Sequence, residues 1–398
     1  MSYDVIIIGG GPSGLIAAQR IARDGHQVLI LEEHRDIGYP DHCAGLISSS
    51  GLSRLGLKTP KEVIQNNITG ARIFSPSNHT LTIERGKREA LVVNRHEFDK
   101  WLAREAQSSG AEIRTECPVR DVFYERGEYI VHCDSHGRSV TERSRVVINA
   151  EGSRGHIAKR LGLSRVPRSH KYPAYQYEVS GVDIPVDYVE MFYGRQISKG
   201  FFAWLIPLGG GRARVGIASK DHAKLRLERC MRKHEVMADR LGGMQIERGF
   251  GGVVLVGLPM TRTAHKGAVS LGDAAGIVKS TTGGGIVVGG AMAQIAGAYI
   301  SKVLLTENGT VELNKFDHKW KSVLYRELQA MFIAQKMLTS LSDKGIDTVV
   351  EGANRYGLLE IVRREGDMDM QRKVISRLLQ NPKMLLLGLR TIRYLYPF

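Results

Sequence analysis

Apolar residues form short continuous runs early in the chain and recur at helical spacing near its end. Residues 3–9 read Tyr-Asp-Val-Ile-Ile-Ile-Gly, a β-branched run typical of a strand buried on both faces of a parallel sheet. Small and apolar residues then recur at helical spacing over 15–23, Gly25 ends that pattern, and 27–31 form a second strand-like run. The chain is therefore predicted to begin with a strand, a helix and a strand.

Further elements follow from the same periodicities. A short buried strand over 268–272 is followed by an apolar, small-residue helix that opens near residue 286 and ends near 303. Over 172–193 the side chains alternate as strands do, whereas helical periodicity dominates after residue 310. The later helices are predicted over 313–341, 346–364 and 374–389. This order predicts an α/β fold: a Rossmann-like domain, an antiparallel-sheet domain and a C-terminal helical region.

Composition excludes several classes of protein. A length of 398 residues suits two domains rather than one, and 42% hydrophobic with 24% charged residues is ordinary globular composition. Disordered and fibrous proteins are therefore excluded. The net charge of +15 suits a polyanion, which by charge alone is a phosphate group, a nucleic acid or an anionic membrane.

The cysteines and the termini indicate a compartment. Cys43, Cys117, Cys133 and Cys230 are scattered without a CxxC pair, so neither a disulfide framework nor a metal site is expected. The N-terminus has no basic region or cleavage site, and no apolar run approaches the roughly 18 residues that span a bilayer. A reducing, cytoplasmic location is expected, with the protein soluble or peripheral to a membrane.

A glycine-rich turn lies between the first strand and the first helix. Gly9, Gly11 and Gly14 have G-x-G-x-x-G spacing, Pro12 stands where a first-turn proline is tolerated, and Glu32 ends the second strand. Such glycines let the backbone approach a pyrophosphate at a helix N-terminus, while the acid takes the ribose hydroxyls. This unit predicts a bound dinucleotide, and the acid argues against a 2′-phosphate.

A second glycine-rich segment identifies the dinucleotide. Gly272 and Asp273 end a buried strand, and Gly283, Gly284, Gly285 and Ile286 open the long apolar helix. This arrangement resembles the second FAD signature of the flavoprotein monooxygenase-like fold, of the p-hydroxybenzoate hydroxylase type. The resemblance implies that Asp273 binds ribityl or ribose hydroxyls and that the helix start faces the flavin pyrimidine ring. A helix N-terminus there would stabilise the negative charge of reduced flavin.

The same resemblance implies further contacts with FAD. Arg95, just before a predicted helix, matches an arginine that reaches the phosphate or ribose region. Glu151 departs from the pattern, because relatives carry Asp-Gly at this place. Four more residues are assigned to the cofactor by the resemblance: Pro12, Ser13, Ala44 and Val119.

Two other segments point to one branch of this fold. His42-Cys43-Ala44-Gly45 resembles the cysteine- and glycine-containing signature of the geranylgeranyl reductase family, and residues 201–207 resemble its aromatic-x-Trp-x-x-Pro motif. Over residues 3–305 the chain resembles the archaeal branch, the digeranylgeranylglycerophospholipid reductases. Phe202 stands where many relatives have Tyr, and Ser280 where many have Pro.

The resemblance implies an enzyme with FAD as cofactor that saturates C=C bonds of geranylgeranyl chains in archaeal-type membrane phospholipids. The residues expected at its substrate pocket are Tyr175, Tyr177, Phe202, Trp204 and Pro207. The predicted domains are a discontinuous FAD-binding domain of residues 1–65, 90–165 and 258–305, a substrate-binding sheet domain of residues 66–89 and 166–257, and the C-terminal helical region of residues 306–398.

Cys43 and His42 are the candidate catalytic residues. An isolated alkene has no carbonyl to polarise it, so a proton must reach one carbon as hydride reaches the other. Free thiols are mostly protonated at neutral pH, so Cys43 suits a proton donor, alone or with His42. A buried, purely structural thiol is the alternative interpretation.

The enzyme also requires an electron donor and access to its lipid substrate. No second strand-glycine-helix-strand unit for NAD(P)H is found, so the donor is expected to be ferredoxin, NAD(P)H that binds transiently, or a membrane carrier. After Asp369 the chain has no acidic residue, while basic and apolar residues alternate. This tail predicts either a basic amphipathic surface for anionic lipid or a helix packed on its own protein.

Three alternatives to the reductase remain. A flavin monooxygenase or halogenase has the same fold, although the Trp-x-Trp-x-x-Ile motif of halogenases is absent, since Trp101, Trp204 and Trp320 are the only tryptophans. A membrane-associated electron-transfer flavoprotein would often carry an iron–sulfur cysteine cluster. Nucleic-acid binding is the weakest alternative, because no aromatic and basic readout motif accompanies the charge.

Overall fold

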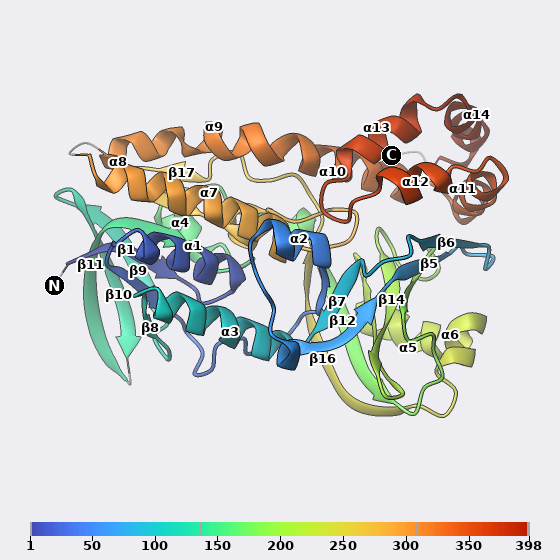
Figure 1. The fold of residues 1–398 in the computed structure, drawn as a ribbon, viewed down its shortest axis with the longest axis horizontal. Coiled ribbons are helices and arrows are strands. Elements are labelled where there is room, and N and C mark those ends of the chain that lie inside the picture. Colours follow the sequence, from blue (N-terminus) through green and yellow to red (C-terminus); the bar gives the residue numbers. More distant parts are fainter. Residues whose placement is uncertain (1, 136, 307–308, 396–398) are drawn as a thin grey trace. The chain divides into compact units, whose positions relative to one another are not determined.

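The computed structural model describes residues 2–135, 137–306 and 309–395, which form two compact units. The first unit contains Met1–Asp41, Arg95–His170 and Gly257–Leu328, and the second contains His42–Asn94, Lys171–Val256 and Gln329–Phe398. The chain therefore passes between the units several times, as the colours of Figure 1 show. Residues 396–398, the end of the predicted basic tail, lie outside the described residues.

A mostly parallel sheet forms the centre of the first unit. Its order is β17-β18-β11-β1-β2-β8, and β9 and β10 extend it from β11 as antiparallel strands. The strands are β1 (Ser2–Ile8), β2 (Val28–Leu31), β8 (Glu112–Arg114), β9 (Val119–Glu125), β10 (Glu128–Ser135), β11 (Arg138–Asn149), β17 (Ala264–His265) and β18 (Ala268–Ser270). Val5, Ile6 and Ile7 of β1 are fully buried, which explains the continuous apolar run.

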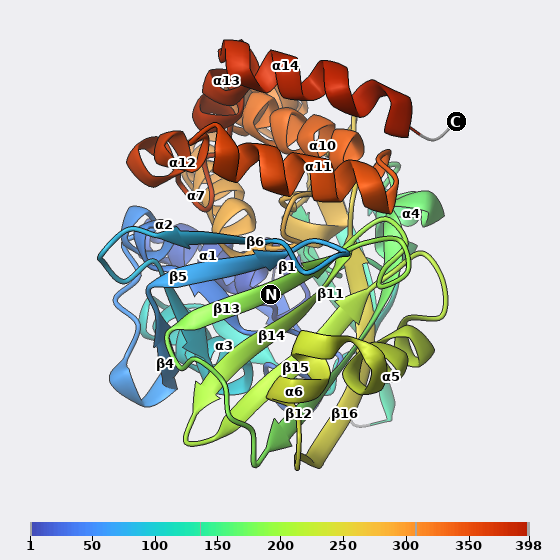
Figure 2. The same cartoon turned by 90° about the vertical axis from the view of Figure 1, so that its right-hand side faces the viewer.

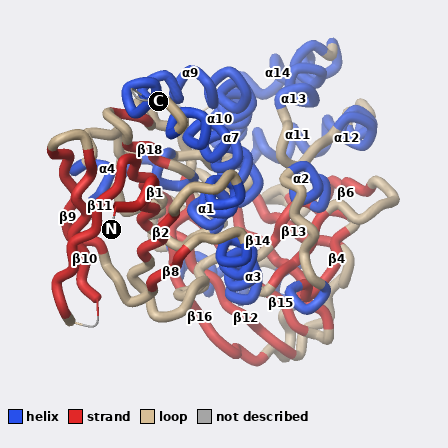
Figure 3. Tube along the Cα trace, turned by 60° about the vertical axis from the view of Figure 1, so that its left-hand side comes forward, coloured by secondary structure: helices blue, strands red, loops and turns tan. Residues whose placement is uncertain are grey.

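Three long helices pack beside this sheet. Helix α1 (Pro12–Arg23) lies between α3 (Arg95–Ser108) and α7 (Ile286–Leu304), as Figures 1 and 3 both show. By length and composition α7 is apolar enough to cross a membrane, which corrects the expectation that no such run exists. Most of α7 is buried, however, so it serves as a core helix of this unit. Shorter helices complete the unit: α4 (His156–Arg160), α8 (Gly309–Glu312) and α9 (Phe316–Trp320).

The second unit is built on a seven-stranded sheet in the order β16-β12-β15-β14-β13-β5-β6, best seen in Figure 2. Its strands are β5 (Gly70–Phe74), β6 (Thr80–Glu84), β12 (Lys171–Ser180), β13 (Tyr188–Tyr193), β14 (Phe202–Gly209), β15 (Arg212–Ala218) and β16 (Gln245–Leu255). All neighbours are antiparallel except the β13 and β5 pair. A small sheet of β3 (Leu46–Ser48), β7 (Ala90–Val93) and β4 (Ile64–Ile68) and the helix α2 (Ser49–Arg54) belong to the same unit.

The two faces of the large sheet differ. On one face, α5 (Ala223–Lys233) and α6 (Glu235–Arg240) bury Leu205, Val215 and Ile217. The other face carries Phe202 and Trp204, with Leu341 and Ile346 from the C-terminal region in the same cluster. Side-chain alternation along β14 thus separates a structural face from a second, aromatic face.

The helical stretch predicted over 313–341 is confirmed, since it continues without a break from Leu313–Lys315 through α9 and a π-helical turn (Lys321–Tyr325) into α10 (Arg326–Thr339). The other C-terminal helices are shorter than the periodicity predicted, and they are α11 (Asp343–Arg355), α12 (Leu359–Glu365), α13 (Arg372–Gln380) and α14 (Pro382–Thr391). The predicted helix over 346–364 is interrupted at Gly357, which has a φ of 66°. The predicted helix over 374–389 is divided at Asn381, whose side chain accepts a hydrogen bond from Lys383 N, with Pro382 at the start of α14.

The predicted α/β fold class is confirmed, and the boundaries of the units differ from the predicted domains. Residues 42–65 group with the second unit, because β3 and β4 pair with β7 there. Residues 90–94 also belong to the second unit, and residues 306–328 belong to the first. Cys43 and Ala44 are consequently part of the unit that holds the aromatic face.

Candidate active site

The predicted glycine turn lies at the carboxyl end of β1. Gly9 has a φ of 107°, and a Cβ on Gly14 would lie 2.4 Å from the carbonyl oxygen of Gly9, so both positions require glycine. Helix α1 starts at Pro12, and among the described residues no side chain caps its N-terminus. The free N–H groups of this first turn suit the phosphate that the sequence predicts there.

Glu32 is placed beside this turn, as the sequence predicts. It lies just beyond the end of β2 and is 9% exposed. Its Oε2 accepts a hydrogen bond of 2.7 Å from Gly10 N, and its Oε1 accepts one of 2.9 Å from His34 N. Glu32, Glu33 and His34 form a partly exposed group whose ligand atoms lie within 4.8 Å of one another. The carboxylate of Glu32 is therefore already hydrogen-bonded to the glycine-rich turn.

The second glycine-rich segment meets the start of α1. A Cβ on Gly272 would lie 2.5 Å from Ser13 Oγ, and one on Gly289 would lie 2.7 Å from the same atom. Asp273 lies next to the start of α7, since a Cβ on Gly285 would come 3.0 Å from its Oδ1. The two predicted cofactor signatures, far apart in sequence, are therefore brought together in the first unit.

Electrostatics at Asp273 fit a buried hydroxyl-binding acid. Burial raises the pKa of Asp273, and the positive charge of Arg95 opposes that rise. Arg95 is held by Asp99, one turn along α3, with its NH2 group 2.9 Å from Oδ2 and 3.1 Å from Oδ1. Burial likewise raises the pKa of Asp99, with Arg95 opposing it. The predicted cofactor arginine is thus oriented by a carboxylate that the sequence did not indicate.

Ser280, which stands where many relatives have Pro, is held by hydrogen bonds in the loop before α7. Its hydroxyl donates to the carbonyl of Gly257 at 3.0 Å and accepts from Gly257 N at 3.2 Å. Lys279 N donates to Gly284 O, and Gly283 N donates to Lys279 O. The loop is fixed by hydrogen bonds, and no side chain of the described residues caps the start of α7.

The structure also places Glu151, which departs from the family pattern, and Val119. Glu151 accepts hydrogen bonds from the backbone of His156, Ile157 and Ala158 at 2.8, 3.0 and 2.8 Å. Its carboxylate therefore caps the start of α4. Val119 begins β9 and its side chain packs against the core of the first unit.

The residues present fit FAD. Two helix starts without side-chain caps, glycines where a Cβ would clash, and the acids Glu32 and Asp273 converge in one unit. Such a set suits a pyrophosphate with hydroxyl groups on either side. Arg95 adds a positive charge near Asp273.

A pair of glycine substitutions separates folding from cofactor binding. We expect Gly14→Ala to lower the melting temperature by about 5 °C or more, because its Cβ would press on the Gly9 carbonyl. A Cβ on Gly11 meets no heavy atom within 4 Å. Gly11→Ala should therefore fold normally when FAD is removed, yet bind FAD at least about ten-fold more weakly by fluorescence titration. Unchanged FAD affinity in Gly11→Ala would contradict the predicted pyrophosphate position.

Cys43 is held in the second unit by a cross-strand row of residues. Gln176 Nε2 donates to the carbonyl of Cys43 at 3.1 Å, and Trp204 Nε1 donates to Gln176 Oε1 at 3.3 Å. Gly216 lies between Gln176 and Trp204 in the sheet register, and a Cβ there would lie 2.5 Å from the indole. The indole of the aromatic motif is therefore connected through one amide to the backbone of the candidate proton donor.

Arg214 fixes the next residue of the same segment. It is 1% exposed and donates to the carbonyls of Ala44 and Val93 at 3.0 and 3.2 Å. Its Nε donates to Glu178 Oε1 at 2.8 Å, and Glu178 faces Arg214 and Arg248 directly in the sheet register. Burial acts to raise the pKa of Glu178, but hydrogen bonds from Arg248 and Arg214 lower it to about 2.

The predicted pocket residues fall on two faces of the sheet. Phe202 lies on the aromatic face with Trp204, their ring centroids 6.2 Å apart. Tyr175 and Tyr177 lie on the opposite face, where they pack with α5 and α6 and Tyr177 donates to Glu228 at 2.7 Å. The structure does not bring these two tyrosines together with Trp204, because alternate residues of a strand point to opposite faces.

The remaining predicted positions are placed as follows. Pro207 is buried in β14, and its carbonyl accepts a hydrogen bond from Asn66 at 3.0 Å. Ala44 packs against the same cluster as Trp204. His42 is exposed and lies beside Gly252 of β16. The structure thus gathers Cys43, Ala44 and Trp204, with His42 adjacent in sequence.

None of the four cysteines, all of which the structure describes, forms a disulfide, and Cys43 differs from the others in burial. Cys43 is half-buried, whereas Cys117, Cys133 and Cys230 are buried. Burial raises the pKa of Cys133 and of Cys230 to about 11. Cys43 also accepts a hydrogen bond on Sγ from Gly45 N at 3.4 Å. It is therefore the accessible thiol of the chain.

The fold and these residues define a flavoprotein with a Rossmann-like unit and a separate sheet unit. The family model described as "FAD binding domain" matches residues 2–241. The digeranylgeranylglycerophospholipid reductase 2 of Methanopyrus kandleri is 30% identical over 388 residues, which cover 95% of this chain and 97% of that protein. The chain belongs to the family of digeranylgeranylglycerophospholipid reductases.

Solved structures agree with this family. The geranylgeranyl bacteriochlorophyll reductase-like protein of Thermoplasma acidophilum superposes with a TM-score of 0.86 at 26% identity, over 98% of this chain and 99% of that one. A flavin-dependent brominase superposes with a TM-score of 0.67 at 16% identity, over 99% of each chain, which shows the shared fold alone.

Proposed function

We propose that this protein is an FAD-dependent reductase that saturates C=C bonds of geranylgeranyl chains in archaeal-type membrane phospholipids. The names of its relatives support the reaction and the substrate class. The observation that carries the proposal to this chain is the hydrogen-bonded row from Trp204 through Gln176 to Cys43. It connects an apolar aromatic surface to the backbone of the residue that carries the accessible thiol, and reduction of an apolar alkene requires both an apolar surface and a proton donor.

Reduction of an isolated alkene requires a proton donor and an apolar surface from the protein. FAD, when bound, would supply the electron pair for the reduction. Cys43 donates a proton to an alkene carbon, and its thiolate takes a proton back from solvent. Phe202 and Trp204 exclude water from the alkene and stabilise positive charge that develops on carbon through their ring faces.

The electrons must come from a donor outside the chain, for which we propose ferredoxin or NAD(P)H. The net charge of +15 supports an acidic protein donor, because opposite charges steer association. A donor protein should reduce the flavin more slowly as salt rises, whereas reduction by NADPH should change less. Stopped-flow bleaching of the flavin absorbance at several salt concentrations separates the two.

The reaction is tested with light as the electron source. The purified FAD-loaded protein is photoreduced without oxygen, mixed with digeranylgeranylglyceryl phospholipid, and followed by flavin reoxidation and mass spectrometry. We expect reoxidation that requires the lipid and a mass gain of 2 Da for each alkene reduced. Reoxidation only after air is admitted would overturn the proposal in favour of a monooxygenase. The same lipid with fully saturated chains is the control.

We also propose a cytoplasmic enzyme that binds peripherally to an anionic membrane through α14. Leu385, Leu386 and Leu389 of this helix and Ile392, just after its end, are 55–68% exposed. Leu387, on another side of the helix, is 1% exposed and packs toward Gly352. Exposed basic residues accompany the apolar ones: Lys383, Arg390 and Arg393. Helix α14 thus packs on its own unit through one side and offers an apolar, basic side to lipid.

Point substitutions test this surface better than a deletion, which would remove the buried Leu387. We expect the double variant Leu385→Ser/Leu389→Ser to float poorly with anionic liposomes, because about 2–4 kcal/mol of apolar burial in the bilayer is lost. Ile333→Ser/Met337→Ser on α10 removes similarly exposed side chains and serves as the control. Equal flotation of both variants and the wild type would contradict the assignment to α14.

A further inference from the structure

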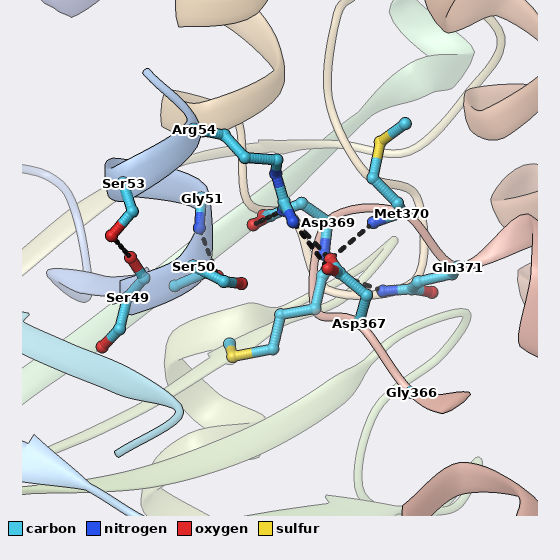
Figure 4. A network of polar contacts seen from close by, with 12 residues as sticks. Ser49, Ser50, Gly51, Ser53, Arg54, Gly366, Asp367, Asp369, Met370 and Gln371 are labelled. Atoms are coloured by element: carbon cyan, nitrogen blue, oxygen red, sulfur yellow. Dashed lines mark hydrogen bonds and ion pairs between the residues drawn. The ribbon is translucent and has the colours of Figure 1, made fainter. Parts of the chain in front are cut away.

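The segment between α12 and α13 is anchored on α2 by a single arginine. Arg54 NH1 lies 2.6 Å from Asp367 Oδ2, and its NH2 lies 3.1 Å from Asp367 Oδ1 and 3.0 Å from Asp369 Oδ2. Figure 4 shows the guanidinium of Arg54 reaching both carboxylates from α2. The side chain of Asp369 is only 1% exposed. A carboxylate so buried needs its cation, so the arginine and the segment are held together.

Other hydrogen bonds fix the backbone of this segment. Arg85 NH1 donates to the carbonyl of Gly366 at 2.5 Å. Asp367 Oδ1 accepts from the backbone N–H of Asp369 and of Met370 at 2.8 and 2.9 Å. The segment is short and irregular, so without such bonds it would be expected to sample several conformations. These hydrogen bonds fix the backbone on both sides of the segment's central residue, Met368.

That central residue, Met368, is apolar and belongs to the aromatic face. It is half-buried and packs against the same buried cluster as Ala44, Leu46 and Trp204. Two aspartates on either side point to Arg54, while the methionine between them packs with the cluster that borders Cys43. Arg54 itself ends the helix that follows β3, eleven residues after Cys43.

We propose that Met368 determines substrate specificity by contacting the isoprenoid chain beside Trp204, and that Arg54 is the residue that positions it. This inference rests on the proposed reductase function. Methionine is unbranched and adapts to irregular apolar surfaces, which suits a flexible polyprenyl chain. The segment continues into α13 and then into α14, so the helix proposed to meet lipid follows this contact in the chain after α13.

Kinetics with chains of different length test the proposal. We expect Met368→Trp to raise KM for the geranylgeranyl lipid about ten-fold, with a smaller effect on a geranyl lipid that has half the chain length. Partly saturated products should accumulate, visible by mass spectrometry, while kcat changes less than KM. Arg54→Ala should change KM and products in the same direction, and Arg54→Lys should restore part of the wild-type behaviour.

Matched variants separate this role from general damage. Met244→Trp enlarges another half-buried methionine of the same unit, which packs against the cluster on the opposite face of the sheet, and Arg364→Ala removes an exposed arginine from α12. Both should keep wild-type KM and products. If wild-type protein reduces the lipid but Met368→Trp keeps its KM and products, the inference fails while the proposed function stands. If the wild type neither binds nor reduces the lipid, the proposed function itself fails.

Discussion

Arg214→Met is expected to lower the free energy of unfolding by about 3–5 kcal/mol, the usual result of removing one partner from a buried ion pair. Arg214 is 1% exposed, and the substitution leaves Glu178 without one of its two cations. It also leaves the carbonyls of Ala44 and Val93 without the donor that they share. Urea unfolding at pH 7 measures the loss.

Arg212→Met is the matched control, two residues away on the same strand. Arg212 pairs with Glu247 at the surface, where the two side chains are 42% and 33% exposed. Exposed pairs of this kind contribute about 0–1 kcal/mol, so we expect a change near that range. Equal destabilisation by both substitutions would contradict the role given to burial.

The effect of Arg214→Met should depend on pH. Because the pKa of Glu178 is lowered to about 2 in the folded protein, its ion pairs add stability above the ordinary pKa of a glutamate. That stability is lost as the pH falls from about 4.5 toward 2. The difference in unfolding free energy between Arg214→Met and wild type should therefore be smaller at pH 3 than at pH 7.

The sequence indicated where the proposed cofactor residues lie in the fold, because their signals are local. Gly14 and Glu32 follow directly from the ends of strands, and the order strand, turn and helix fixes where each points. Gly272 and Asp273 were found for the same reason. The meeting of Gly272 with Ser13 then follows, because the strands that carry both segments lie in one sheet.

The substrate half was predicted only in part, because it depends on register between distant strands. Tyr175 and Trp204 both looked suitable as aromatic residues of strands, but only pairing of β12 with β15 and of β15 with β14 shows that they face opposite sides. The pairing of Glu178 with Arg214 and Arg248 has the same origin. A polar or charged residue at every second position of 176–178 and 212–214 was the available signal, but the partners of these residues follow only from the sheet.

The sequence did not indicate the position of the Met368 side chain, for a different reason. It lies in an irregular segment between two helices, where no periodicity indicates which side chain is buried. Its position follows from ion pairs between Arg54 and two aspartates more than three hundred residues along the chain. Long-range ion pairs of this type leave no local pattern, whereas glycine turns do.

Cys43→Ser is expected to slow reduction of the lipid alkene by about 10²–10⁴-fold, the usual contribution of a positioned general acid. Serine keeps the size of the side chain but is a far weaker acid than a thiol. The contacts given above for Cys43 lie within the second unit, whereas Glu32, Arg95 and Asp273 lie in the first. FAD content and flavin photoreduction should therefore stay at the wild-type level.

Single-turnover reoxidation of the photoreduced flavin by lipid isolates this step from electron delivery. Gln176→Leu keeps the thiol but removes the donor to the Cys43 carbonyl, so it should slow the same step by a smaller factor. Cys117→Ala, which removes a buried thiol from the core of the first unit, is the control and should change stability without slowing reoxidation specifically. If Cys43→Ser reduces lipid alkenes at the wild-type rate with full FAD, Cys43 is not the acid. The proton must then come from another group or from solvent, and the row from Trp204 to Cys43 would have a purely structural role.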